Sequence, residues 1–270
     1  MFRRNRAALF GLALLVAIVA MTVFGPLLYK VDPMEIVSAP LLAPGEDGLP
    51  LGTDYLGRDL LAGIINGGRA SLAVGLSAAV LTMLLGVTTG ALAGFYGGWV
   101  DRVLMRVTEF FQVLPPLILA MTIVLLFQPS LASVVISIGL VSWPTPARLT
   151  RAEFLRIREL DYVKAARSMG ASNARIILRL ILPNAAPPLI VAATLTVGAA
   201  ILFEGGLSFL GLGDSNAISW GLIMGLNRPY MLDAWWTTTL PGIALFLTVL
   251  AVGLVGDGLN DAFNPRLRER

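Results

Sequence analysis

Long runs of apolar residues dominate this chain and restrict what it can fold into. The first run extends from Ala7 to about Tyr29, and runs of similar character recur along the chain. Roughly 20 apolar residues suffice for an α-helix to cross a bilayer. The composition agrees, because 56% of the residues are hydrophobic and only 14% are charged, whereas soluble domains carry about 25% charged residues. We therefore expect an all-α integral membrane protein.

The first apolar run favours a membrane span over a signal peptide. It is longer than the roughly 7–15 residues of a signal-peptide core, and no clean cleavage site follows it. Six transmembrane helices account for all the runs. Their expected limits, by residue number, are about 7–29, 71–96, 101–127, 131–149, 182–203 and 239–255. The first span and the polar loop after it form an N-terminal unit, residues 1–69, and residues 70–270 form the core transmembrane domain.

The placement of Lys and Arg orients these spans. An even number of spans puts both termini on one side, and that side carries 16 of the 20 Lys and Arg residues. Because cytoplasmic loops are enriched in Lys and Arg, we expect cytoplasmic termini and a cytoplasmic loop at about 150–180. Outside the membrane we expect the loop 30–69, with a short amphipathic helix at 55–68, and a Gly-rich and Trp-rich loop at 204–238. A polar tail is expected from residue 256.

Several function classes are disfavoured by the residue types. The chain has no Cys and no His, which removes disulfides, thiolate chemistry, the commonest metal ligand and the usual general base. We expect no cofactor and no metal in this chain. An intramembrane enzyme would need paired acids deep in a span, and a stand-alone channel would need a repeated polar stripe; neither pattern is present. The net charge of +3 says little about nucleic acid, and we expect no nucleic-acid partner.

The basic loop at 150–180 combines helix-forming residues with one central glycine. Val163, Ala166, Met169 and Gly170 recur at helical spacing and predict one apolar face. Gly170 is expected to end a short helix, and Ser172 or Asn173 to cap the next. The predicted structure is two helices joined by a sharp turn, with a small apolar knob that a partner surface can approach closely. The alternative is a solvated loop that only sets topology.

The order of residues in this loop resembles a known family. Ala165-Ala166, Gly170, Leu180, Leu182 and Pro183 resemble the cytoplasmic motif of permease subunits of binding-protein-dependent ABC importers. The resemblance implies that this segment is a coupling helix that docks in a groove of an ATPase subunit. The implied docking residues are Lys164, Ala165, Ala166, Arg167, Ser168, Met169, Gly170 and Ala171. Lys164 stands where the family usually has Glu and Leu180 where it has Ile, so an acid–ATPase salt bridge is not expected.

Three further motifs in the expected order narrow the resemblance. Leu51–Asp59, Glu204–Gly213 with Trp220-Gly221, and Gly256–Asp261 with Asn264–Arg266 are similar to segments of the C-type permease of dipeptide, oligopeptide and nickel importers. The resemblance implies a fold like that of type I ABC importer permeases in the cytoplasmic (inner) membrane. It also implies a second homologous permease as a heterodimer partner, two ATPase subunits that bind ATP and Mg²⁺, an extracytoplasmic solute-binding protein and contact with membrane lipid. Import of di- or oligopeptides is the expected function, with a nickel chelate or another small solute as the alternative.

Two groups of residues outside the membrane are candidates for contacts or gating. Gly52, Asp54, Gly57, Arg58 and Asp59 form either an ordinary turn with a helix cap or a contact with the binding protein, and the two interpretations are compatible. Glu204, at the outer end of the fifth span, is a candidate brace of the outer gate, because acids near the membrane are often functional. The alternative places Glu204 in the headgroup layer. Trp220, Trp235 and Trp236 are expected in an interfacial aromatic belt.

Overall fold

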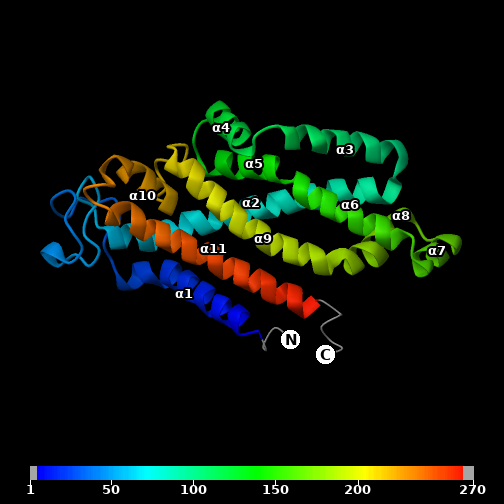
Figure 1. Ribbon diagram of the computed structural model, residues 1–270, viewed down its shortest axis with the longest axis horizontal. Coiled ribbons are helices and arrows are strands. Elements are labelled where there is room, and N and C mark those ends of the chain that lie inside the picture. Colours follow the sequence, from blue (N-terminus) through cyan, green and yellow to red (C-terminus); the bar gives the residue numbers. More distant parts are fainter. Residues whose placement is uncertain (1–4, 264–270) are drawn as a thin grey trace.

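The computed structural model describes residues 5–263, which are mostly helical (Figure 1). Four helices are long and apolar enough to cross a membrane: α1 (Arg6–Leu28), α2 (Leu60–Tyr96), α9 (Leu182–Phe209) and α11 (Trp236–Phe263). They run side by side along the long axis of the molecule. The short helix α8 (Asn173–Ile176) and a π-helical turn (Ile177–Ile181) lead into α9, giving a continuous run of 37 residues. The predicted all-α membrane fold is confirmed.

The segment expected to form the third span is sharply bent. Helices α3 (Gly98–Val113) and α4 (Pro116–Phe127) meet at 91°. Pro115 and Pro116 cause the break, because proline lacks an amide hydrogen and keeps the preceding residue out of the helical region. The prediction of one continuous span over 101–127 was therefore wrong.

The segment expected to form the fourth span is also divided. Helix α5 (Leu131–Ser142) has only 12 residues, and after Trp143 the chain continues as α6 (Pro144–Arg158). By length and composition, the described residues offer four spans, or five if the bent pair α3–α4 counts as one, against the six predicted. The fourth predicted span, residues 131–149, corresponds to α5 with the start of α6, and neither helix is long enough to count as a span by itself.

Three element boundaries differ from the predictions. Helix α2 begins at Leu60 and absorbs the amphipathic helix expected at 55–68. Helix α9 extends to Phe209, so Glu204 lies inside a helix and not in the loop expected at 204–238. Residues 210–219 of that expected loop connect α9 to α10 (Trp220–Asn227). Helix α11 continues to Phe263 through most of the expected tail. Tertiary packing favours these extensions: Gly205 in α9 lies so close to α11 that a Cβ there would be 2.4 Å from Leu245.

Helix α2 is the centre of the fold, and three glycines let α6 pack closely against it. Gly86, Gly90 and Gly94 recur every fourth residue and face α6. A Cβ at Gly90 would lie 2.2 Å from the carbonyl oxygen of Ala147, closer than any side chain can approach. Small residues at such spacing allow helix backbones to meet in membranes. This stripe holds α6, which leads to the basic segment at 161–180, against α2.

An arginine compensates for a proline in α1. Pro26 cannot donate a hydrogen bond to the carbonyl of Thr22, four residues earlier. Arg69 of α2 supplies that bond: its Nε donates to the Thr22 oxygen at 2.8 Å, and its Nη2 donates to the Val23 oxygen at 3.0 Å. The first span is thereby fastened to the second at its outer end.

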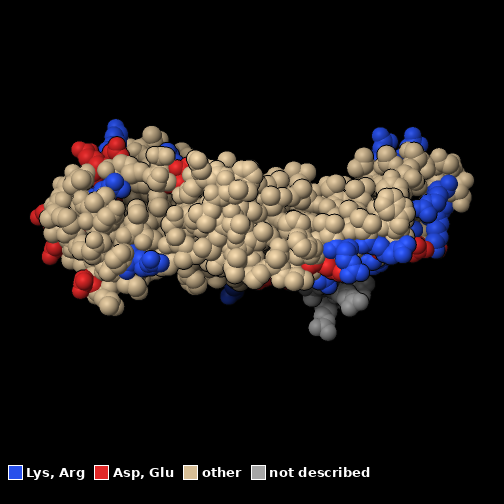
Figure 2. All heavy atoms as spheres, turned by 90° about the horizontal axis from the view of Figure 1, so that it is seen from above, with Lys and Arg blue, Asp and Glu red and all other residues tan. Residues whose placement is uncertain are grey.

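Charge is unevenly distributed along the molecule. Figure 2 shows a middle zone almost free of charge and an end, the one that carries α7 (Asp161–Ser168), dominated by Lys and Arg. The start of α1 and the end of α11 lie together, because Asn5 Nδ2 donates to Asp261 Oδ2 at 2.8 Å. Both of these helix ends point toward the half of the molecule that carries α7 (Figure 1).

Candidate functional site

The predicted helix–glycine turn–helix is present at the basic end. Helix α7 ends at Ser168, Gly170 has φ +80°, and α8 begins at Asn173 with Ser172 as its N-cap. The amide of Gly170 donates to the Arg167 carbonyl at 3.0 Å, and the amide of Ala171 donates to the Ala166 carbonyl at 3.1 Å. A left-handed glycine with such backward hydrogen bonds is a common way to end a helix.

The expected apolar face of this segment is split between two environments. Val163 is fully buried, at 0% exposure, in a cluster with Phe154, Ile157 and Ile176. Met169 is 81% exposed, so the prediction that both residues share one apolar face was wrong. The short helix turns Val163 inward and leaves the outer surface to the other residues of the segment. The exposed docking candidates are Lys164, Ala165, Arg167, Ser168, Met169 and Gly170, and Ala166 and Ala171 are half-buried.

Lys164 has a partner within its own chain. Its Nζ lies 3.4 Å from Oε2 of Glu159, and both side chains are largely exposed. Exposed pairs of this kind contribute little, about 0–1 kcal/mol, so Lys164 remains available to another protein. Neighbouring arginines anchor the segment more firmly: Arg158 Nη1 donates to the Gly94 carbonyl at 2.8 Å, and Arg151 Nη2 donates to Asp101 Oδ2 at 2.6 Å. These contacts join α6 to α2 and α3.

The outer loop folds into a turn that needs both of its predicted glycines. Gly52 and Gly57 have φ of +73° and +84°, and a Cβ at either position would lie 2.2 Å or less from a carbonyl oxygen of the loop. Asp54 Oδ1 accepts from the amides of Leu56 and Arg58 at 2.8 and 2.9 Å. The turn interpretation of this motif is therefore confirmed, and contact with a binding protein stays a prediction.

Asp59 joins the first span to the second. It is the N-cap of α2, and its Oδ1 accepts from the amide of Ala62 at 3.1 Å. Its Oδ2 accepts from the hydroxyl of Tyr29, the residue that follows α1. Burial, this hydrogen bond and the nearby carboxylate raise the pKa of Tyr29 to about 12, so the hydroxyl keeps its proton at neutral pH. The remaining candidate, Arg58, is half-buried, and its Nε has no partner among the described residues.

Glu204 lies at the meeting point of three helices. It is only 2% exposed; Oε1 accepts from Ser208 Oγ at 2.7 Å, and Oε2 accepts from Ser71 Oγ at 3.1 Å. Ser71 Oγ in turn accepts from the amide of Trp220 at 3.2 Å. Glu204 thus links α9 to α2 and, through Ser71, to α10. Glu204 is therefore enclosed by protein, and sequence analysis missed Ser71 because it lies 133 residues away.

Two of the three tryptophans do not form the expected belt. Trp220 is fully buried and donates its Nε1 hydrogen to the Ile64 carbonyl at 2.8 Å. Trp236 is buried in the same apolar cluster, whereas Trp235 is 55% exposed. The belt prediction was wrong for Trp220 and Trp236, because Trp220 at the start of α10 and Trp236 at the start of α11 pack into one buried cluster with residues of α1, α2 and α9.

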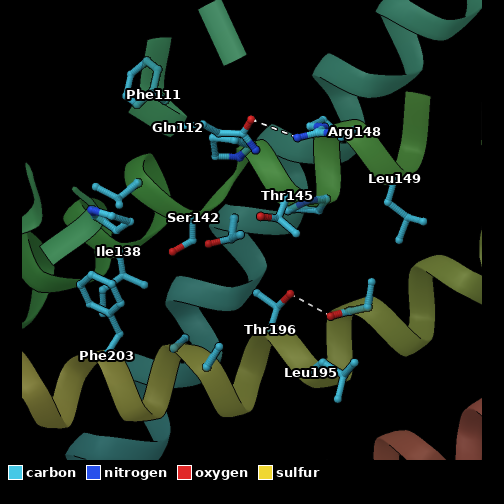
Figure 3. A pocket seen from close by; sticks show the side chains of 18 residues that line it. Phe111, Gln112, Ile138, Ser142, Thr145, Arg148, Leu149, Leu195, Thr196 and Phe203 are labelled. Atoms are coloured by element: carbon cyan, nitrogen blue, oxygen red, sulfur yellow. Dashed lines mark hydrogen bonds between the residues drawn. The ribbon is translucent and has the colours of Figure 1, made fainter. Parts of the chain in front are cut away.

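A cavity of about 720 Å³ lies between α2, α3, α5, α6 and α9, with Pro116 of α4 at its edge. Its walls are mainly apolar, from residues such as Ile138, Leu195 and Phe203 (Figure 3). Its polar lining residues are Thr82, Gln112, Ser142, Thr145, Arg148 and Thr196. Sequence analysis did not find this site, because its residues come from six helices and no motif unites them.

Three features of the polar lining decide what the cavity can bind. Arg148 Nη1 donates to Gln112 Oε1 at 3.2 Å, as the dashed line in Figure 3 marks. Thr82 is fully buried, and its hydroxyl has no partner among the described residues. None of the described residues that line the cavity is acidic. The cavity is partly open, because Gln112, Thr145 and Arg148 are exposed, and it offers one cation and several hydroxyls beside apolar walls. Such a combination is a typical setting for a small organic solute.

Apolar helices of spanning length, a helical segment projecting at the basic end and an internal cavity together define a membrane transport subunit. The chain belongs to the family of binding-protein-dependent transport system inner membrane components, which matches residues 86–269. Residues 1–45 match the N-terminal transmembrane domain of oligopeptide transport permease C. The family resemblance of the sequence motifs is thereby confirmed.

Several individual proteins are similar to this chain over nearly its whole length. A di/tripeptide transport system permease protein of Pseudomonas aeruginosa is 42% identical, covering 99% of this chain and 90% of the relative. A dipeptide transport system permease protein of Haemophilus influenzae is 36% identical, covering 99% and 93%. A chain of the MetNI methionine ABC transporter has a similar fold, with a TM-score of 0.62 and 19% identity over 75% of this chain and 96% of that one.

Proposed function

We propose that this chain is one of two permease subunits of an ABC importer that carries di- and oligopeptides across the cytoplasmic membrane. The observation that carries the proposal is full-length similarity to permeases of di/tripeptide and dipeptide transport systems. The cavity of about 720 Å³ supports it, because pockets for small solutes measure roughly 300–1,000 Å³. A nickel chelate or another small solute is the alternative cargo.

In this proposal the chain carries out no chemical step and binds no cofactor. A second, homologous permease completes the pathway as a heterodimer partner. Two ATPase subunits bind ATP and Mg²⁺ on the cytoplasmic side, and an extracytoplasmic binding protein delivers the solute. Placing the termini and α7 in the cytoplasm agrees with the concentration of Lys and Arg at that end (Figure 2).

Residues Lys164–Ala171 are proposed to dock in a groove of one ATPase. The exposure of Met169, Ala165 and Gly170 supports this, since small and flexible apolar groups fit closely into a partner surface. No acid stands at the position of Lys164, so the contact rests on shape and apolar burial. Because buried Val163 and the Arg158 bond to α2 fasten the segment to the spans, closure of the ATPases would move α6 and α2 as a rigid unit.

At the outer end, Glu204 is proposed to brace the closed gate through Ser71 and α10. The loop that holds Gly52, Asp54, Gly57, Arg58 and Asp59 is proposed to contact the binding protein. Its two left-handed glycines and the buried Asp59 cap support this role, because they give the loop a defined shape for recognition.

Uptake by the purified complex tests the proposal. The two permeases and the ATPases are reconstituted in vesicles with ATP enclosed, and the binding protein is added outside. ATP-dependent uptake of a labelled dipeptide or tripeptide is the expected result. Uptake of chelated nickel without peptide uptake would instead establish the alternative cargo, and complexes that form without this chain and still transport would refute its role.

A further inference from the structure

Arg148 differs from the other arginines of α6 in its electrostatic environment. Arg151 pairs with Asp101, Arg156 with Glu153 and Arg158 with Glu159. Arg148 has no carboxylate within ion-pair distance among the described residues; its recorded partner is the neutral amide of Gln112. Figure 3 shows both side chains at one side of the cavity. A guanidinium group has five donors arranged to match a carboxylate, so most of the hydrogen-bonding capacity of Arg148 is unused.

The cavity beside Arg148 suits a ligand with one negative end. Arg148 is the only charged residue among those that line it. A carboxylate entering the cavity would therefore meet one positive charge and no negative charge. An ammonium group would find no acid there, so the amino end of a zwitterionic ligand must be held elsewhere.

We propose that Arg148 binds the carboxyl-terminal carboxylate of the transported peptide. The apolar walls of the cavity then accept the side chains of the peptide without strong preference among them. This inference rests on the proposed function and adds to it the orientation of the cargo: the carboxyl end lies toward α6. Charge-assisted bidentate contacts of this type are among the stronger hydrogen bonds in proteins.

The test compares a peptide with its carboxyl-terminal amide. The probes are trialanine and trialanine amide, and their binding to the detergent-solubilised complex is measured without the binding protein, so that the selectivity of the latter does not interfere. The wild-type complex should bind the acid about tenfold to a hundredfold more tightly than the amide. Arg148→Gln should abolish that preference by weakening only the acid, and Arg148→Lys should restore part of it.

A matched control separates binding from structure. Arg102→Gln serves for this, because Arg102 is an exposed arginine outside this cavity that likewise has no carboxylate within ion-pair distance among the described residues. It should leave the preference for the acid unchanged. Equal effects of Arg148→Gln on acid and amide would overturn the inference. If the complex takes up peptides but shows no such discrimination, only this inference fails; if it takes up no peptide, the proposed function fails.

Discussion

Replacing Ser71 with alanine should loosen the outer end of the helix bundle. The Ser71 hydroxyl donates to Glu204 and accepts from the amide of Trp220, the first residue of α10. Its removal leaves the buried Trp220 amide without a partner, which costs about 1–3 kcal/mol, and Glu204 loses one of its two hydrogen bonds, which costs about 0.5–1.5 kcal/mol. The expected loss in the free energy of unfolding is therefore about 2–4 kcal/mol.

Thermal unfolding of the purified protein, followed by tryptophan fluorescence, measures this loss. A protein of this size shifts in Tm by about 2–4 °C per kcal/mol, so the expected decrease is roughly 5–15 °C. Ser77→Ala is the matched control, because Ser77 is exposed on the same helix, and it should change stability by less than about 0.5 kcal/mol. If the two variants unfolded at the same temperature, the argument that Ser71 joins α2, α9 and α10 would be refuted.

Three further substitutions test other parts of the structure. Gly170→Val should leave ATP hydrolysis intact while uptake in vesicles falls, because φ of +80° costs a branched residue about 1–2 kcal/mol and the substitution distorts the turn. Gly170→Asn should have a milder effect, because asparagine adopts this backbone conformation more readily. Equal uptake by wild type and Gly170→Val would contradict docking through this turn. Gly90→Ala should lower the free energy of unfolding by about 1–3 kcal/mol, because its Cβ would overlap the Ala147 carbonyl. Gly253→Ala is the control: a Cβ at Gly253 meets no atom within 4 Å, so this substitution should not lower the free energy of unfolding. Tyr29→Phe should remove a pH-dependent part of stability: since the folded pKa of about 12 exceeds the ordinary 10.0, the contact with Asp59 stabilises fully below pH 10 and is lost toward pH 12. Identical alkaline unfolding curves for wild type and Tyr29→Phe would disprove the last expectation.

The differences between the predicted and observed spans have a common cause. The sequence indicated breaks at Gly205-Gly206 and at the polar residues after Gly256, yet α9 and α11 continue through them. Both helices pack against each other there, and packing outweighs the low helix propensity of glycine. At Pro115-Pro116 the chain does bend, whereas a second proline pair, Pro187-Pro188, is accommodated inside α9.

The sequence by itself determined the features that depend on neighbouring residues. Apolar runs of spanning length predicted an all-helical membrane protein, and the left-handed turn at Gly170 followed from the residues around it. The motif from Ala165 to Pro183 could be recognised because its spacing is short and fixed. Local geometry and the energy of transfer into a bilayer suffice for such predictions.

Only the tertiary structure decided where distant residues meet. Glu204 changed from a headgroup candidate to a buried link because Ser71, 133 positions earlier, lies beside it. The cavity exists because the α3–α4 bend and the close α2–α6 contact leave a space between helices that no local pattern encodes. Arg148 was one of many arginines expected in the cytoplasm, and its place in the lining of the cavity distinguishes it from the others. Such sites arise from side chains that long-range packing brings together, so they become visible only when the helices are placed against one another.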